Sequence, residues 1–221
     1  EAWAFRQHLA MVELAIRASC GRWLVMMPDL VENLDILSAM RGPQAVMYDL
    51  ADRPEWVQTR LDQINAAYCE SFAAFQELVR DGFGGNSFCF SVWGPGRTAK
   101  VQCDACAMIG PAMFRRIVAP ALAAQCRWLD YSLFHLDGED CLPNLDELLA
   151  VAPLRAIEWT PRRLSVGDSG GHPRHWELYR RILAAGKSGT EVRRIHRDEL
   201  RRLAADRDVA AQVVRLLDAW V

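Results

Sequence analysis

The feature that most constrains the fold of this chain is the alternation of short, apolar segments with longer segments of helical periodicity. Residues 131–138 and 155–160 are short runs rich in apolar residues that end in polar ones. Elsewhere, apolar residues recur at spacings of three and four, as Val57, Leu61 and Ile64 do, which is the period of an amphipathic helix. Continuously apolar strands that alternate with helices are typical of a parallel sheet covered by helices. The sequence therefore predicts an α/β fold.

The same patterns predict where the individual elements lie. Helices are expected over 2–19, 29–41, 52–79, 111–129, 145–151, 174–185 and the tail 198–221. Strands are expected over 23–27, 87–93, 101–104, 131–138 and 155–160, with a weak last strand over 192–195. This gives five or six strands in 221 residues.

Charge and composition exclude several classes of protein. The net charge is −2 and the hydrophobic fraction is 51%, so a packed core is expected and there is no electrostatic case for binding nucleic acid or an anionic membrane. No apolar run approaches the roughly 20 residues that span a bilayer, and residues 1–9 do not resemble a secretory signal. There are seven cysteines, which is an odd number, and their spacing is irregular. This favours free thiols in a reducing compartment, and the cytoplasm is expected. Because the first residue is not Met, we expect a processed product or a fragment.

The predicted strands end in polar loops, several of which carry glycine. These loops are Pro28-Asp29, Trp93-Gly94, Asp137-Gly138 and Trp159-Thr160. In a (β/α)8 barrel such loops meet at one face and build the active site. A full barrel has eight strands and usually about 250 residues, so we expect one barrel domain over 1–221 that is incomplete and lacks its opening βα units. Unpaired sheet edges favour association, and a homodimer is expected.

His135 and Asp137 are the most suggestive pair of polar residues. In a strand, residues two apart point to the same side, so both side chains are aimed into one space at the strand's end. Such a pair can bind a metal or act as acid and base. A simple hydrogen bond between the histidine and a carboxylate, with no metal, is the alternative.

Gln102, Cys103 and Asp104 form a second polar group beside an apolar strand. Asp104 is either a solvated loop carboxylate, a pocket acid, or a metal ligand together with Cys103. Cys103 and Cys106 also form a C-x-x-C pair, but no second pair completes four thiolates, which favours buried thiols.

Three further residues have both a structural and a functional interpretation. Asp29, with Glu32 three residues later, predicts a capping box at a helix start, although its carboxylate can also face a ligand at the barrel mouth. Glu158 is either buried and paired or catalytic. Trp159 is either core or pocket wall.

Taken together, these motifs resemble those of the uroporphyrinogen decarboxylase superfamily, which includes the methylcobamide:coenzyme M methyltransferases. The resemblance is carried by 27–29, 52–55, 101–104, 108–114, 134–138 and 157–160, and its best-matching core is 23–160. It implies a (β/α)8 barrel with its pocket at the C-terminal ends of the strands, often in a dimer. We expect Asp104, His135 and Asp137 to be catalytic. We expect the substrate to be bound by Asp29, Trp93, Gln102, Glu158 and Trp159.

The two branches of this superfamily imply different chemistry. Decarboxylases remove carboxyl groups from a tetrapyrrole without a cofactor, and a decarboxylase-like enzyme is our first expectation. Methyltransferases hold zinc with a His-x-Cys pair and a later cysteine, and they activate a thiol that takes a methyl group from a corrinoid. Here His135-x-Asp137 stands in place of the first pair, and no cysteine follows Cys141. A methyltransferase with a zinc-like divalent metal at His135, Asp137 and Cys103 is the alternative. A truncated, non-catalytic relative that binds a tetrapyrrole or a corrinoid protein is the second alternative.

Overall fold

The computed structural model of the chain describes residues 2–162 and 172–190. The helices are α1 (Trp3–Ser19), α2 (Asn33–Arg41), α3 (Pro43–Asp52), α4 (Pro54–Val79), α5 (Pro111–Met113), α6 (Ala119–Trp128), α7 (Leu145–Leu149) and α8 (Trp176–Ala184). The strands are β1 (Gly85–Phe88), β2 (Val92–Pro95), β3 (Thr98–Gln102), β4 (Tyr131–Asp137), β5 (Ala156–Thr160) and β6 (Ser188–Thr190). Short helical turns are η1 (Cys89–Ser91), η2 (Asp104–Met108), η3 (Phe114–Val118), η4 (Glu139–Asn144) and η5 (Pro173–His175).

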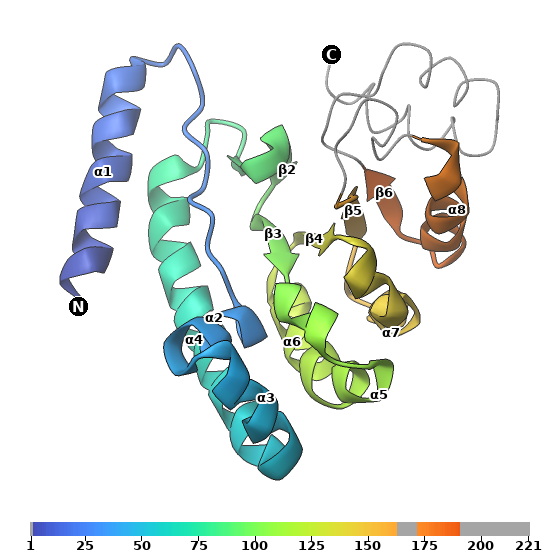
Figure 1. Ribbon diagram of the computed structural model, residues 1–221. Coiled ribbons are helices and arrows are strands. Elements are labelled where there is room, and N and C mark those ends of the chain that lie inside the picture. The colour runs from blue at the N-terminus through green and yellow to red at the C-terminus, as the bar shows by residue number, and fades with distance from the viewer. Residues whose placement is uncertain (1, 163–171, 191–221) are drawn as a thin grey trace.

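Strands β3 to β6 form one parallel sheet in the order β3-β4-β5-β6. Each strand therefore pairs with the next one along the chain, and helices connect them (Figure 1). β1 and β2 form a separate antiparallel hairpin. The prediction of an α/β fold with a parallel sheet is confirmed, whereas the described residues form no closed barrel.

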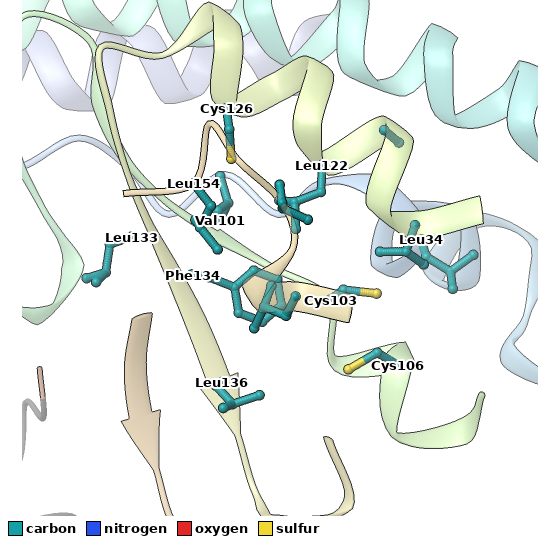
Figure 2. Close-up of a cluster of buried hydrophobic side chains, with 14 of the residues drawn as sticks. Leu34, Val101, Cys103, Cys106, Leu122, Cys126, Leu133, Phe134, Leu136 and Leu154 are labelled. Atoms are coloured by element: carbon teal, nitrogen blue, oxygen red, sulfur yellow. The ribbon is translucent and has the colours of Figure 1, made fainter. Parts of the chain in front are cut away.

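The two faces of the sheet differ in chemistry because alternate residues of a strand point to opposite sides. Val101, Phe134 and Ile157 are each at most 1% exposed and belong to the hydrophobic core. Figure 2 shows Val101 and Phe134 grouped with Leu122 of α6. Burying an apolar side chain of this size contributes about 1.5–3 kcal/mol. The opposite face carries polar residues, and these lead to the candidate site described below.

Helix α4 shows how the sequence pattern becomes packing. Pro54 occupies its first turn, where a missing N–H costs nothing. Its buried face is formed by residues at helical spacing, namely Val57, Leu61, Asn65, Tyr68, Phe72, Phe75 and Val79. Phe72 packs edge-to-face on Trp128 of α6 with ring centroids 5.5 Å apart. The Asn65 amide donates to the Ala121 carbonyl at 2.9 Å, so α4 and α6 are joined by both apolar and polar contacts.

The predicted strand over 23–27 is wrong. This segment is extended but belongs to neither sheet, and its described backbone bond to β1 runs from Met27 N to Ser87 O at 2.7 Å. Trp23 and Leu24 are 53% and 58% exposed. A continuous apolar run indicates a strand whose two faces are covered by helices, whereas here the run is outside the sheet and only Met27 of its five residues is buried.

The predicted capping box at Asp29 is also wrong. Helix α2 begins at Asn33, with Glu32 at the N-cap position and no side-chain capping bond. Asp29 instead pairs with Lys100, and Glu32 is fully buried and accepts a hydrogen bond from the backbone N–H of Gln102. Both carboxylates are therefore used by a distant strand. The sequence pattern also missed α3, because Pro43 begins a new helix after Gly42.

The predicted strand over 87–93 is two strands. The turn η1 interrupts it, and Phe90 within that turn has a left-handed backbone with φ of 73°. The hairpin requires glycine at position 85, because a Cβ atom there would lie 2.4 Å from the Gly94 carbonyl oxygen. The expected strands over 131–138 and 155–160 are found as β4 and β5 with shifts of one residue, whereas the strand expected over 101–104 overlaps β3 only at residues 101–102.

Two predicted elements, the strand over 192–195 and the helical tail over 198–221, lie outside the described residues. All seven cysteines are free. Among the described residues, no helix has the length and apolar character needed to cross a membrane.

Candidate metal centre

The register of the parallel sheet places two rows of polar side chains at its C-terminal edge. Gln102 pairs with His135, and His135 pairs with Glu158, so these three side chains lie in one row on one face. Asp137 pairs with Thr160 two residues further on, and Asp104 follows Gln102 at the end of β3. Polar groups from three strands thus meet at one edge, as the sequence predicts.

Asp104, His135 and Asp137 converge most closely. Each offers one ligand atom, and these atoms all lie within 4.8 Å of one another. Both aspartates are exposed, whereas the histidine is partly buried. A cavity of about 400 Å³ opens beside them. It is lined by Asp104, Ala107, Asp137, Gly138, Asp140, Thr160, Pro161 and Arg162, so a small molecule placed in it would touch two of the three convergent groups.

A buried carboxylate fixes the His135 ring. Glu158 is fully buried, and its Oε2 is hydrogen-bonded to His135 Nδ1. The Thr160 hydroxyl donates to the other oxygen, Oε1, at 2.6 Å. Metal-binding histidines commonly use one ring nitrogen for such a carboxylate, which sets the tautomer and raises the basicity of the other nitrogen. His135 Nε2 is therefore the nitrogen left for a ligand.

Opposing effects act on the protonation of His135. Burial acts to lower the pKa of His135, but the hydrogen bond that its Nδ1–H donates to Glu158 and the negative charges of Glu158, Asp137 and Asp104 outweigh this effect, so the pKa is raised. An imidazole in this field attracts a cation, whether that cation is a proton or a metal ion.

The backbone beside Asp104 is held by a carboxylate from another helix. Asp35 of α2 accepts hydrogen bonds from the backbone N–H groups of Asp104 and Ala105, each at 2.8 Å. It also accepts one from the Gln102 side-chain amide at 3.1 Å. The carboxyl group of Asp104 packs partly among other side chains although the residue is exposed. This desolvation and the negative charge of Asp35 raise the pKa of Asp104.

A buried lysine connects this edge to the N-terminal part of the chain. Lys100 is 4% exposed, and its Nζ lies 2.7 Å from Asp29 Oδ1. It also donates to Gln102 Oε1. Burial acts to lower the pKa of Lys100, but the charges of Glu32 and Asp29 raise it overall. Lys100 therefore stays charged and orients the Gln102 amide, whose nitrogen donates to Asp104 Oδ2 at 3.1 Å.

Phe90 covers the histidine from the hairpin. Its ring centroid lies 5.0 Å from that of His135, at an interplanar angle of 40°. A non-glycine residue held with positive φ costs on the order of 1–3 kcal/mol and is often found at functional sites. Sequence reasoning missed Phe90, Lys100, Glu32 and Asp35 as site residues. The place of Lys100 between the apolar residues Ala99 and Val101 was a signal that could have indicated it.

The donor set fits a divalent metal ion. Two carboxylate oxygens and one imidazole nitrogen suit Zn²⁺, Mn²⁺, Co²⁺ or Fe²⁺, and such sites keep open positions for water or substrate. The buried Glu158 supplies the outer carboxylate that metal-bound histidines normally have. A metal site that binds and activates a substrate heteroatom requires convergent ligands, a cavity beside them and an oriented imidazole. This edge of the sheet has all three features.

Other predicted site residues are placed differently. Cys103 is 2% exposed and lies in the hydrophobic core near Cys106 (Figure 2), so it is not one of the convergent ligands. Trp159 is fully buried and packs edge-to-face on His175 at 5.4 Å, which makes it core. Trp93 donates from its indole nitrogen to Asp81 at 2.7 Å. Asp29 reaches the site only through Lys100.

No protein-family model, curated protein or solved structure matches this chain. The resemblance to the uroporphyrinogen decarboxylase superfamily stays a prediction.

Proposed function

We propose that this chain is a divalent-metal enzyme that works in the manner of the methyltransferase branch of the uroporphyrinogen decarboxylase superfamily. The observation that carries the proposal is the convergence of Asp104, His135 and Asp137 within 4.8 Å, together with the buried Glu158 behind the histidine. A decarboxylase without a cofactor needs no such set of ligands, whereas an enzyme that activates a thiol or hydroxyl group does.

The metal would supply Lewis acidity that lowers the pKa of a coordinated thiol or hydroxyl group and so makes a nucleophile at neutral pH. Asp104, His135 and Asp137 would hold the metal. Asp104 lies just after the end of β3, and His135 and Asp137 both lie on the neighbouring strand β4. Glu158 would hold the proton on Nδ1, so that Nε2 faces the metal, and would keep the ring correctly turned. Phe90 would exclude water from one side of the ring. In the reaction implied by the resemblance, a methyl group moves from corrinoid cobalt to the substrate sulfur, and the electron pair of the broken bond stays on cobalt.

The fold supports this proposal in a second way. Four parallel strands in sequential order, with polar groups at their C-terminal edge, are the arrangement of one sector of a (β/α)8 barrel. A doubly wound sheet would reverse its strand order at a switch point, and β3 to β6 do not reverse. We therefore propose that the sheet is part of such a barrel, with its pocket at this edge.

The test is metal binding followed by turnover. The purified chain is titrated with Co²⁺, whose visible absorption reports the ligands, and with Zn²⁺ by calorimetry. The metal-loaded chain is then mixed with methylcobalamin and a small thiol, and loss of the methyl–cobalt absorption is followed. We expect stoichiometric metal and methyl loss in the native chain, and neither in His135→Ala.

A matched control is His8→Ala, because His8 lies exposed on α1. This variant should bind metal and react as the native chain does. If the native chain binds no metal at micromolar concentrations, or if His135→Ala binds it equally well, the proposal is wrong.

A tetrapyrrole decarboxylase is the second candidate, and one observation favours it. Arg162 lines the cavity that Asp104 and Asp137 also line. An arginine can bind a substrate carboxylate, and an acid whose pKa is raised, as that of Asp104 is, can return a proton to the product. Release of carbon dioxide from uroporphyrinogen that resists a chelator but is lost in Asp104→Asn would favour this candidate over the first.

A further inference from the structure

A second cavity lies between α2, α4 and the extended segment before α2. Its volume is about 580 Å³, which is within the range of small-molecule sites. Most of its lining is apolar. It is lined by Asp29, Leu30, Val31, Ile36, Leu37, Met40, Arg60, Gln63, Ile64, Ala67, Tyr68 and Ser71. Met40 is 79% exposed at its rim, so the cavity opens to solvent.

Arg60 differs from the arginines beside it. Arg41, Arg53 and Arg60 all place their guanidinium groups within 5.6 Å of the Trp56 ring centroid. Arg41 and Arg53 both pair with Asp49. Within residues 2–162 and 172–190, Arg60 has no carboxylate partner, and its buried Nε has no hydrogen-bond acceptor.

An unpaired guanidinium in an apolar wall is costly. A buried donor without an acceptor costs about 1–3 kcal/mol and more when the group is charged, and such groups are normally paired. The carboxylate that also lines the cavity, Asp29, is already paired with Lys100. The cavity thus offers apolar contacts together with a cationic, forked donor that matches a carboxylate.

We propose that this cavity binds a medium-length alkyl carboxylate, with its acid group on Arg60 and its chain against the apolar residues of α2 and α4. The acid group accepts hydrogen bonds from the terminal guanidinium N–H groups of Arg60, and the chain covers Ile64, Leu37 and Met40. This site is separate from the metal centre in its residues and its chemistry.

The test compares two probes of equal chain length, decanoate and decanol, below their aggregation concentrations. Calorimetry or the fluorescence of the tryptophans, of which Trp56 is next to Arg60, follows the binding. We expect decanoate to bind saturably and at least about tenfold more tightly than decanol, which corresponds to about 1.4 kcal/mol, because only decanoate brings a charged acceptor to the guanidinium.

Three variants separate the charge from the cavity. Arg60→Gln should weaken decanoate about tenfold and leave decanol unchanged. Ala67→Phe, at an exposed position of α4 that lines the cavity, should fill the space and weaken both probes. Arg53→Gln should leave both unchanged, because Arg53 pairs with Asp49 instead of lining the cavity. Far-ultraviolet circular dichroism confirms that each variant is folded.

Several outcomes would overturn the proposal. These are equal affinity of the native chain for the two probes, native affinity for decanoate in Arg60→Gln, or no saturable decanoate binding. A native dimer that Ala67→Phe converts to a monomer would show that a second copy of the chain, and not a carboxylate, fills the cavity.

Discussion

Replacement of Glu158 by glutamine tests whether the buried carboxylate supports a metal-binding histidine. Glu158→Gln preserves the side-chain length and one acceptor oxygen for His135 Nδ1, but it removes the negative charge. We expect the variant to fold and to bind Zn²⁺ and Co²⁺ more weakly than the native chain does.

The magnitude follows from the contacts. One charge-assisted hydrogen bond, worth about 1.5–3 kcal/mol, is replaced by a neutral one worth about 0.5–1.5 kcal/mol. Loss of the carboxylate behind a metal-bound histidine typically lowers metal affinity about 10–100-fold, or about 1.4–2.7 kcal/mol. Because Glu158 is 0% exposed, no water is available to replace its charge, and the larger end of the range is expected.

The assay is calorimetric titration with Zn²⁺ at fixed pH, with Thr160→Val as the control. Thr160 donates to Glu158 Oε1 at 2.6 Å, so its replacement removes a hydrogen bond to the carboxylate and leaves the charge in place. We expect a loss below about threefold in this control, because the Thr160 bond is present with and without the metal and the carboxylate behind His135 keeps its charge. The reasoning would be refuted if Glu158→Gln bound Zn²⁺ as tightly as the native chain does, or if Thr160→Val lost as much Zn²⁺ affinity as Glu158→Gln.

Three further predictions concern stability. Gly85→Ala should lower the free energy of unfolding by about 1–3 kcal/mol, because the added Cβ atom clashes with the backbone. Gly82 has open space around it, so Gly82→Ala should change this free energy little. Equal urea midpoints for the two variants would contradict the prediction. Asp49→Asn should be less stable than the native chain at pH 7. The hydrogen bond from its arginine partner lowers the pKa of Asp49 in the folded chain, so this stabilisation is present above the unfolded pKa of about 3.9 and is lost as the pH falls through the folded pKa. Urea unfolding at pH 7 and below pH 3 measures the difference in free energy of unfolding between Asp49→Asn and the native chain. If this difference persists at acid pH, the prediction is wrong. Phe72→Ala should lower the free energy of unfolding by about 3–5 kcal/mol, since the ring is fully buried. Phe83 is exposed, so Phe83→Ala should lower this free energy by under about 0.5 kcal/mol. Similar losses in the two variants would contradict the packing argument.

The sequence predicted elements well where local periodicity and tertiary packing agree. The apolar spacing of α4 identifies its buried face, since Val57 and Leu61 are buried and Ile64 is half-buried. The strands that carry His135 and Glu158 were also identified, because an apolar run between two helices has few alternatives.

The failures at Asp29 and Glu32 have one physical origin, which is that distant residues use these carboxylates. Asp29 has the sequence context of a helix cap, but Lys100 takes its carboxylate from 71 residues away. Glu32 was expected to cap the same helix and instead accepts from Gln102. No local pattern encodes such long-range bonds. The convergence of Asp104 with His135 and Asp137 was foreseeable only as a consequence of strand ends meeting at one edge.

The bond between Asp35 and the backbone at Asp104 has a consequence for communication across the molecule. Helix α2 supplies this carboxylate, and the same helix supplies Leu37 and Met40 to the apolar cavity. An occupant of the cavity that shifts α2 would also shift Asp104, the proposed metal ligand, so the two proposed sites would influence each other's affinity. Thermodynamic reciprocity requires that filling either site change the affinity of the other by the same factor. Helix α2 would couple the two sites, although each site can be filled without the other.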